Sequence, residues 1–277
     1  MQLVERRQLS LDAPIVTYLP YFRVADARSD KITIRHILTH TSGLPDVENY
    51  DWDRPEYDDR ALERYVRSLA TVTLRSAPGA TYAYSNLAFE VLVDVIAKAS
   101  RMPFENYVQK DILEPLRMAS STLSYDGVAR QAWAAGHTRT AAGAMTIIPH
   151  YPYNRAHAPS STMHASASDM SRWMLAMLNG GELDGRRIIR EASLNEMWKP
   201  TVEAREGRIG LAWLSLTVEG EDLIWHGGAD AGFRARLMLL PARRSGVIVL
   251  ANSDRVNTNK LAQFALGAAV ALDLPAK

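Results

Sequence analysis

Two short stretches of the sequence carry side chains that could act on an acyl group. The first, Tyr84-Ser85-Asn86, lies between the turn Pro78-Gly79-Ala80 and an apolar run, so a phenol and an amide would project from one rigid junction. A phenol near cations can lose its proton and act as a general base, and an amide can hold an acyl substrate. The alternative is that Asn86 merely caps the following helix while Tyr84 fills the core, and on spacing alone this alternative is the commoner outcome.

The second stretch, His226-Gly227-Gly228, follows a β-type run and is itself followed by Gly232-Phe233. Glycines beside a strand let a ligand lie against the strand edge, where backbone N–H groups can pair with an oxyanion or a peptide. The alternative is a tight turn that holds a structural histidine. Taken in isolation, that alternative would again be preferred.

Other chemistries find little support. His36 and His40 are four residues apart, but they lack the His-Glu-x-x-His pattern and a third ligand, so we expect both to hydrogen-bond and pack, with no metal site. The sequence contains no Gly-x-Ser-x-Gly and no glycine-rich phosphate loop, which argues against an α/β-hydrolase elbow and against kinase or dinucleotide sites. Zero cysteines exclude disulfides and thiol nucleophiles. We expect no cofactor.

The composition is that of an ordinary globular chain. Hydrophobic residues make up 47% and charged residues 23% of the 277 residues, with a net charge of +1. This balance gives no reason to expect a nucleic acid or an anionic membrane as partner. Charges interrupt every apolar run before it could span a membrane. The first residues contain no signal-peptide core, and the compartment is not determined by the sequence.

Hydrophobic periodicity predicts helices in the first two thirds of the chain and near its end. The helix over Leu87–Ser100 is apolar nearly all round, and Glu90, Asp94 and Lys98 are predicted to form its only solvent-facing stripe. Ser166 with Asp169 gives a capping-box pattern. The opening residues Met1–Arg7 are expected to be the end of a helix. Further helices are expected from Thr33 to Ser42-Gly43, from Asp58 through Leu69, over Leu87–Ser100, from Ser166 to Leu178, and from Asn257 to Leu272.

After Gly180 the period changes to that of strands. The runs Gly210–Val218, Asp222–His226, Arg234–Leu240 and Gly246–Ala251 are separated by turns at Glu219-Gly220, Gly227-Gly228 and Pro241–Ser245. Helices followed by an antiparallel meander and a terminal helix predict an α+β fold. We expect a single domain over 1–277, with a helical lobe at about 31–178 and a sheet lobe at about 1–30 and 179–277.

Together these residues resemble a known family. The stretch Ile32–Leu44 (ITIRHILTHTSGL) looks like a signature of class C β-lactamase and penicillin-binding-protein-like serine hydrolases, a family that includes family VIII-type esterases and D-peptidases. The resemblance implies an antiparallel sheet flanked by helices plus a mostly helical lobe. Further stretches agree in order: Leu9–Pro20, Pro78-Gly79, Tyr84-Ser85-Asn86, Glu114–Met118, Met163–Trp173, His226-Gly227-Gly228, Gly232-Phe233 and Val249–Asn252.

The resemblance assigns roles to individual residues. In the family a Ser-x-x-Lys, the Tyr of Tyr-x-Asn and a Lys/His-x-Gly strand carry out hydrolysis through an acyl-enzyme. It implies catalytic roles for Tyr84 and His226, and substrate-binding roles for Asn86, Gly227 and Gly228. The implied partner is a small-molecule acyl substrate: an ester, an amide or a D-peptide. Because histidine is mostly neutral at pH 7, His226 in place of lysine favours these substrates over β-lactams.

One family motif is absent. None of the six lysines has a serine three residues before it, so the sequence contains no Ser-x-x-Lys. By resemblance we expect Met1 to be an internal methionine of the nucleophile helix, with the N-terminal strands and that helix missing. The alternative is genuine loss, which would make the chain a non-catalytic protein that binds acyl ligands. In either case we expect the chain as given to be inactive, and to associate through an unpaired edge at Gly246–Ala251.

Overall fold

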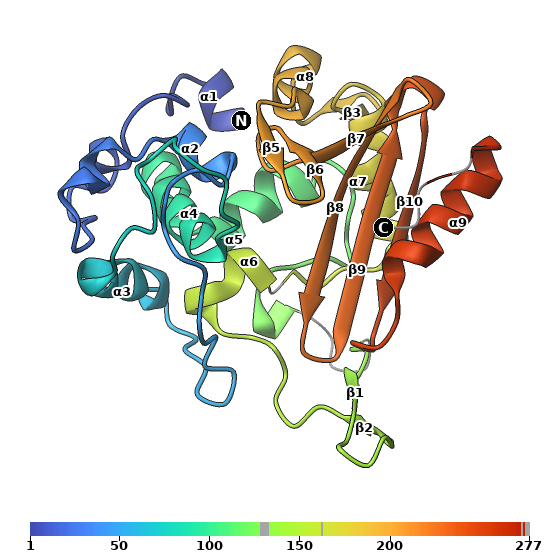
Figure 1. Cartoon of the computed structure of the whole chain (residues 1–277), viewed down its shortest axis with the longest axis horizontal. Coiled ribbons are helices and arrows are strands. Elements are labelled where there is room, and N and C mark those ends of the chain that lie inside the picture. Colours follow the sequence, from blue (N-terminus) through green and yellow to red (C-terminus); the bar gives the residue numbers. More distant parts are fainter. Residues whose placement is uncertain (128–132, 162, 273, 275–277) are drawn as a thin grey trace.

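The computed structural model describes residues 1–127, 133–161, 163–272 and 274. A group of helices lies on one side and an antiparallel sheet on the other, with one helix covering the far face of the sheet (Figure 1). This arrangement confirms the α+β prediction. The helices are α1 (Gln2–Glu5), α2 (Ile34–Leu38), α3 (Ala61–Ser68), α4 (Asn86–Ser100), α5 (Phe104–Val108), α6 (Ala158–Ser161), α7 (Ala167–Leu178), α8 (Glu191–Trp198) and α9 (Thr258–Val270).

Helix starts follow the capping chemistry of the sequence. The Thr33 hydroxyl accepts a hydrogen bond from the backbone N–H of His36, which confirms the predicted start of α2. Ser166 likewise accepts from the N–H of Asp169 at the start of α7. The Asp169 carboxylate does not complete a capping box, because it accepts hydrogen bonds from the Ser121 hydroxyl and from a backbone N–H of the preceding segment.

The main sheet is antiparallel throughout, in the order β10-β9-β8-β7-β6-β5, and two separate hairpins pair β1 with β2 and β3 with β4. It confirms the predicted meander and adds two short strands to it. The strands are β1 (His137–Arg139), β2 (Met145–Ile147), β3 (Glu182–Leu183), β4 (Arg186–Arg187), β5 (Val202–Ala204), β6 (Gly207–Ile209), β7 (Leu214–Val218), β8 (Glu221–Asp230), β9 (Phe233–Leu240) and β10 (Ser245–Ala251).

Two strand predictions are wrong. The run Gly210–Val218 is extended only from Leu214, because Ala212 adopts a φ of 66° and donates its N–H to the Leu38 carbonyl at 2.7 Å instead of to a neighbouring strand. The turn predicted at Gly227-Gly228 is also absent. There β8 continues to Asp230, since its partner strand β9 pairs with it along this whole stretch.

Each face of the sheet packs against a different part of the chain. Ile224, Leu237 and Leu239 face the helical side and pack with Met177 of α7. On the opposite face, Trp225 and its neighbours pack against α9. Side chains therefore alternate along β8, so His226, Gly228 and Asp230 share the helical-side face with Ile224. This places the second predicted motif between the sheet and the helices.

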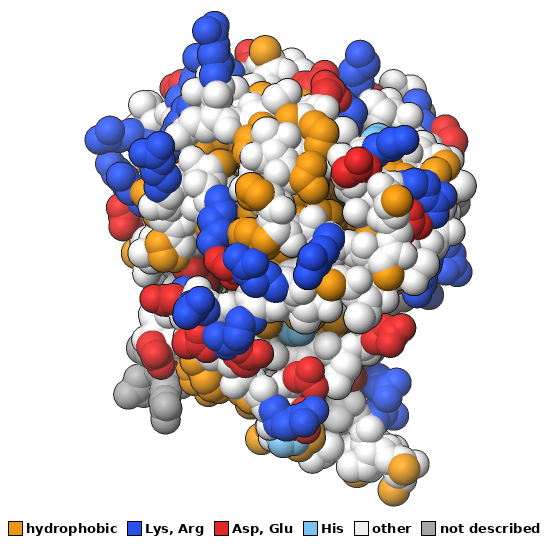
Figure 2. Space-filling model, turned by 90° about the vertical axis from the view of Figure 1, so that its left-hand side faces the viewer, with side chains coloured by type: hydrophobic (Ala, Val, Ile, Leu, Met, Phe, Trp, Pro, Cys, Tyr) orange, Lys and Arg blue, Asp and Glu red, His pale blue; other side chains and the backbone are white. Residues whose placement is uncertain are grey.

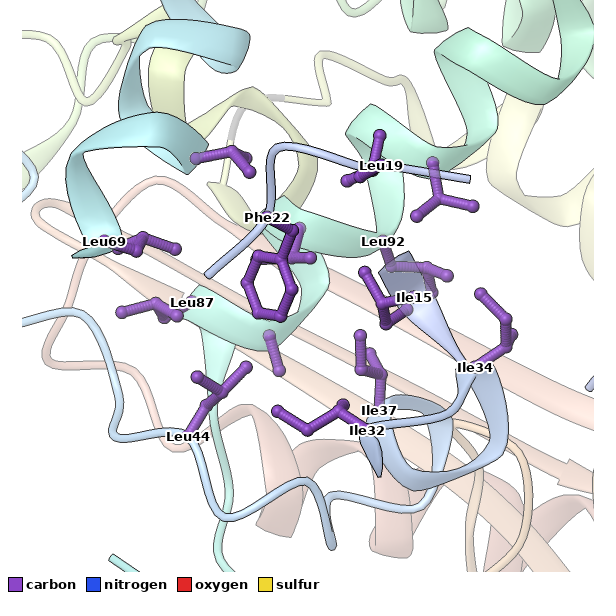
Figure 3. Close-up of a cluster of buried hydrophobic side chains, with 14 of the residues drawn as sticks. Ile15, Leu19, Phe22, Ile32, Ile34, Ile37, Leu44, Leu69, Leu87 and Leu92 are labelled. Atoms are coloured by element: carbon purple, nitrogen blue, oxygen red, sulfur yellow. The ribbon is translucent and has the colours of Figure 1, made fainter. Parts of the chain in front are cut away.

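The helical side has its own core, built around α4 (Figure 3). Ile15, Leu19 and Phe22 pack there among the helices, whereas the sequence predicts the sheet side for residues 1–30. The predicted solvent-facing stripe on α4 is wrong at Glu90 and Asp94, which are 0% and 2% exposed. Both can be buried because each carboxylate accepts a hydrogen bond from a residue distant in the sequence. His157 donates to Glu90, and the Tyr21 hydroxyl donates to Asp94.

The surface carries charges of both signs. Figure 2 shows Lys and Arg side chains interspersed with Asp and Glu on the face formed by the N-terminal helices. Such mixing accords with the net charge of +1. Among the helices that the structure describes, none combines the length and apolar character needed to cross a membrane.

Candidate active site

Tyr84-Ser85-Asn86 forms the entry into α4, and the middle residue caps that helix. The Ser85 hydroxyl accepts from the Ala88 N–H at 3.0 Å and donates to the Pro45 carbonyl at 2.7 Å. The alternative in which Asn86 caps the helix is therefore wrong. Tyr84 does not fill the core either, since it is 41% exposed. Neither side chain is needed for the cap, and the Tyr84 hydroxyl lies 3.3 Å from the Asn86 amide oxygen.

The segment that follows α2 supports this entry. The Ala83 N–H donates to the His40 carbonyl at 2.8 Å, and the Ser85 N–H donates to His40 Nδ1 at 3.1 Å. A few residues further on, Asp46 accepts the Asn86 N–H at 2.7 Å. One continuous stretch, 40–46, therefore fixes the backbone on both sides of Tyr84 and Asn86.

His40 also supports the phenol directly. Its ring stacks on that of Tyr84 with centroids 4.3 Å apart. Burial, helped by the nearby His226, lowers the pKa of His40 to about 3. The ring is therefore neutral, and because Nδ1 accepts a hydrogen bond, Nε2 carries the proton. His36 caps α2 through its own Nδ1, so both histidines pack and hydrogen-bond as expected. Among the described residues, no group of three or more His, Cys, Asp or Glu side chains could hold a metal ion.

His226 lies where one edge of β8 becomes free. Pairing between β7 and β8 ends at Leu214 and Trp225, and beyond that point the described chain pairs β8 only with β9. The edge from His226 to Asp230 therefore presents backbone groups that could pair with an extended ligand. His226 Nδ1 donates to the Gly227 carbonyl at 2.9 Å, which leaves Nε2 as the acceptor of the neutral ring. Burial lowers the pKa of His226.

The structure brings the two predicted motifs together. The rings of Tyr84 and His226 have centroids 6.5 Å apart. Gly227 lies opposite Arg236 of β9, and a Cβ at Gly227 would lie 3.2 Å from the guanidinium carbon. That guanidinium packs over Trp225, on the far face of the sheet. A phenol, an amide, an imidazole and an open strand edge therefore converge, while the neighbouring arginine faces away from them.

The phenol of Tyr84 holds its proton firmly. Partial burial, followed by the negative charge of Asp46, raises the pKa of Tyr84 to about 12. Asp230 and Glu206 make smaller contributions in the same direction. The sequence predicts a general base on the condition that cations lie nearby. In the surroundings described here, the charged groups that act on the phenol are acidic, and it is a proton donor.

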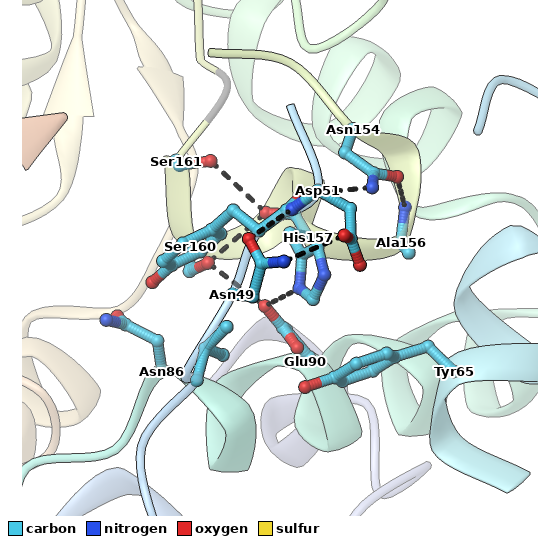
Figure 4. A network of polar contacts seen from close by, with 12 residues as sticks. Asn49, Asp51, Tyr65, Asn86, Glu90, Asn154, Ala156, His157, Ser160 and Ser161 are labelled. Atoms are coloured by element: carbon cyan, nitrogen blue, oxygen red, sulfur yellow. Dashed lines mark hydrogen bonds and ion pairs between the residues drawn. The ribbon is translucent and has the colours of Figure 1, made fainter. Parts of the chain in front are cut away.

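A second network connects α4 to the segment before α7 (Figure 4). Glu90 receives hydrogen bonds from His157 Nδ1 at 2.7 Å and from the Ser160 hydroxyl at 3.2 Å. Burial raises the pKa of Glu90. Because Glu90 lies one helical turn after Asn86, this network fixes the first turns of α4. Sequence reasoning missed it, together with Asp46; an acidic residue inside a nearly all-apolar helix was the available signal.

A cleft of about 750 Å³ opens beside the strand edge. It begins at Gly228, two residues beyond His226, and extends past Asp230 and Phe233 to Trp133 and Tyr151. Tyr84 and His226 do not line it. The cleft is therefore a neighbour of the converging groups, reached along β8.

Known proteins resemble this chain over nearly its whole length. It is 23% identical over 265 residues to Protein flp of Staphylococcus aureus (95% of this chain, 52% of that protein). It is 26% identical to the D-alanyl-D-alanine-carboxypeptidase/endopeptidase AmpH of Escherichia coli (90% and 66%). The chain thus spans about half the length of the first of these relatives.

Solved structures share the fold. The octameric penicillin-binding protein homologue from Pyrococcus abyssi superposes with a TM-score of 0.82 at 22% identity, covering 99% of this chain and 63% of that one. This likeness assigns a β-lactamase-like fold. The profile of the Beta-lactamase family matches residues 1–272. The chain belongs to the Beta-lactamase family.

Proposed function

We propose that this chain carries the proton-transfer and substrate-binding part of a serine hydrolase that cleaves esters, amides or D-peptides through an acyl-enzyme. The observation that supports the proposal is the helix cap. Because Ser85 caps α4, the side chains of Tyr84 and Asn86 are available together, close to the strand edge at His226. A purely structural junction would not need both groups turned away from the core.

The proposed chemistry divides among these groups. A serine hydroxyl attacks the substrate carbonyl, and backbone N–H groups at the free edge of β8 stabilise the oxyanion that forms. Tyr84 takes the proton of the serine hydroxyl as it passes its own to the leaving group, and Asn86 holds the acyl part of the substrate. Water then attacks the acyl-enzyme and releases the acid. His226 supplies a neutral imidazole where a lysine would supply a cation, which favours substrates without a carboxylate at that position.

Activity requires a nucleophile that the 277 residues do not contain as Ser-x-x-Lys. The 277-residue chain should therefore give background rates with p-nitrophenyl acetate, nitrocefin and D-alanyl peptides. If the reading frame upstream of the Met1 codon encodes Ser-x-x-Lys, a chain extended to include it should hydrolyse short-chain esters. An extended chain that remains inactive on all three substrate classes would refute the proposal.

The role of Tyr84 can be tested in that extended chain. Tyr84→Phe should lower the rate by about 10²–10⁴, the usual range for a proton-transfer group. Tyr57→Phe is a matched control, because Tyr57 is also exposed and lies outside both the cleft lining and the converging groups. A loss below about tenfold for Tyr84→Phe would reduce it to a structural role.

The second candidate is a protein that binds acyl ligands without cleaving them, and the absence of Ser-x-x-Lys from the sequence favours it. Ser85 cannot substitute as the nucleophile, because it is 0% exposed and both of its hydrogen bonds are internal. A stop codon directly upstream of Met1 would support this candidate, as would binding of D-alanyl peptides by the 277-residue chain without turnover.

A further inference from the structure

The cleft beside β8 has an aromatic wall. The rings of Trp133 and Tyr151 lie 4.6 Å apart, and the rings of Tyr151 and Phe233 meet edge to face at 5.8 Å. All three residues line the cleft. Aromatic faces of this kind bind apolar groups and also attract cations, through the negative charge of the ring face.

One carboxylate stands at the strand side of this cleft. Asp230 is the last residue of β8, on the same face as His226, and it lines the cleft. Its neighbour Arg234 donates to the backbone carbonyls of Asp230 and Phe233, at 2.8 and 2.7 Å. No side chain in the described ranges forms an ion pair with Asp230. Burial raises the pKa of its carboxyl to about 7, and the charge of the neighbouring Arg234 offsets this rise only in part.

The charged side chains that act on Tyr84 are all acidic. Asp46, Glu206 and Asp230 all raise the pKa of Tyr84. The cation that acts on His226 is Arg236, which packs over Trp225 on the far face of the sheet. The Arg234 guanidinium also lines the cleft, but among the described residues it donates to backbone carbonyls and to none of these carboxylates. The carboxylates near Tyr84 and in the cleft therefore favour a positively charged ligand.

We propose that the cleft binds the amine-bearing acyl part of the substrate, with an ammonium group against Asp230 and an apolar side chain against Trp133, Tyr151 and Phe233. This inference rests on the proposed function and names its substrate class as aminoacyl esters and amides. The spacing fits: Gly228 and Asp230 are two residues apart, about 6.6 Å along a strand. An aminoacyl group plus one hydrogen bond to the carboxylate covers that distance when its carbonyl lies at Gly228.

Binding to the 277-residue chain tests the inference without any hydrolysis. The probes are 2-phenylethylamine, which carries the ammonium, and 2-phenylethanol, its neutral counterpart, titrated at pH 8 by calorimetry. The wild-type chain should bind the amine about tenfold more tightly, the scale of one charge-assisted hydrogen bond. Equal affinities for the two probes would overturn the inference before any variant is made.

Variants then locate the effect. Asp230→Asn should abolish the preference for the amine, whereas Asp222→Asn should keep it, because Asp222 lies on the same strand, is exposed and is absent from the cleft lining. Thermal unfolding of each variant checks that it is folded. A preference that survives in folded Asp230→Asn would assign amine binding to another site and refute the proposal.

The two proposals can fail separately. An extended chain that hydrolyses 3-phenylpropionate and phenylalanine esters equally well would refute amine recognition and leave the hydrolase intact. A 277-residue chain that prefers the amine through Asp230, next to an extended chain that hydrolyses nothing, would refute the hydrolase and leave amine recognition intact.

Discussion

Ser85→Ala should destabilise the fold more than the loss of an ordinary helix cap. The hydroxyl makes two hydrogen bonds, one from the Ala88 N–H at 3.0 Å and one to the Pro45 carbonyl at 2.7 Å, and Ser85 is fully buried. Loss of the cap costs about 1 kcal/mol, and loss of the bond to Pro45 costs about 1 kcal/mol more. The sum of about 2 kcal/mol corresponds to a fall in melting temperature of roughly 4–8 °C for a chain of this size.

Ser166→Ala is the matched control for this prediction. Ser166 also caps a long helix through its hydroxyl, accepting the Asp169 N–H at 3.1 Å, so its loss should cost about 1 kcal/mol. Urea denaturation of both variants, followed by circular dichroism, measures the difference. If Ser85→Ala costs no more than Ser166→Ala, the bond to Pro45 contributes nothing, and the argument that residues 40–46 fix the entry to α4 fails.

Two further perturbations test other parts of the structure. Burial raises the pKa of Glu90 above its unfolded value, so the native state holds the proton more tightly and stability is lost as pH rises above about 4.3. The stability advantage of wild type over Glu90→Gln should therefore shrink between pH 4 and 8. The control Glu48→Gln, at an exposed position, should follow wild type. A stability difference between wild type and Glu90→Gln that stays constant with pH would contradict the raised pKa of Glu90. At the sheet edge, β10 pairs only with β9 among the described strands, and we expect self-association through it, seen as a concentration-dependent mass in light scattering. Leu250→Lys, at a 40% exposed position on β10, should reduce that mass more than Leu261→Lys on α9, which is 50% exposed; a monodisperse wild-type monomer would refute the expectation.

Local signals in the sequence predicted the local structure. Thr33 and Ser166 start helices because a side-chain hydroxyl next to a free backbone N–H needs no distant partner. The prediction of a turn at Gly227-Gly228 was wrong for a related reason. Two glycines indicate a turn by local propensity, but seven consecutive pairs between β8 and β9 hold them in the strand.

The carboxylates of α4 were mispredicted because their partners lie far away in the sequence. The Tyr21 hydroxyl that binds Asp94 is 73 residues away, and the His157 ring that binds Glu90 is 67 residues away. Spacing alone indicates a solvent-facing stripe, since charged residues four apart usually mark one. A pairing that depends on the tertiary fold leaves no periodic signal.

The candidate site likewise combines residues that local motifs predict with contacts that depend on the tertiary fold. The motifs predicted Tyr84, Asn86 and His226, and the structure brings Tyr84 close to the other two; their roles stay predictions. The contribution of His40 could not be predicted, because stacking of its ring on Tyr84 depends on how residues 40–46 cross the start of α4. Histidine in a helical stretch indicates packing, and here the packing partner is the proposed catalytic group.

The protonation of Tyr84 decides how the proposed chemistry can run. Its pKa of about 12 arises from partial burial and from acidic neighbours. A cation within hydrogen-bonding distance would lower the pKa of the phenol from that value. In the described surroundings, Tyr84 is protonated at pH 7. We infer that it acts as a relay, taking a proton from the nucleophile as it gives its own away, rather than as a resident phenolate. The neutral His40 ring stacked beneath it suits this role, because a charged histidine there would change the pKa of the phenol each time it titrated.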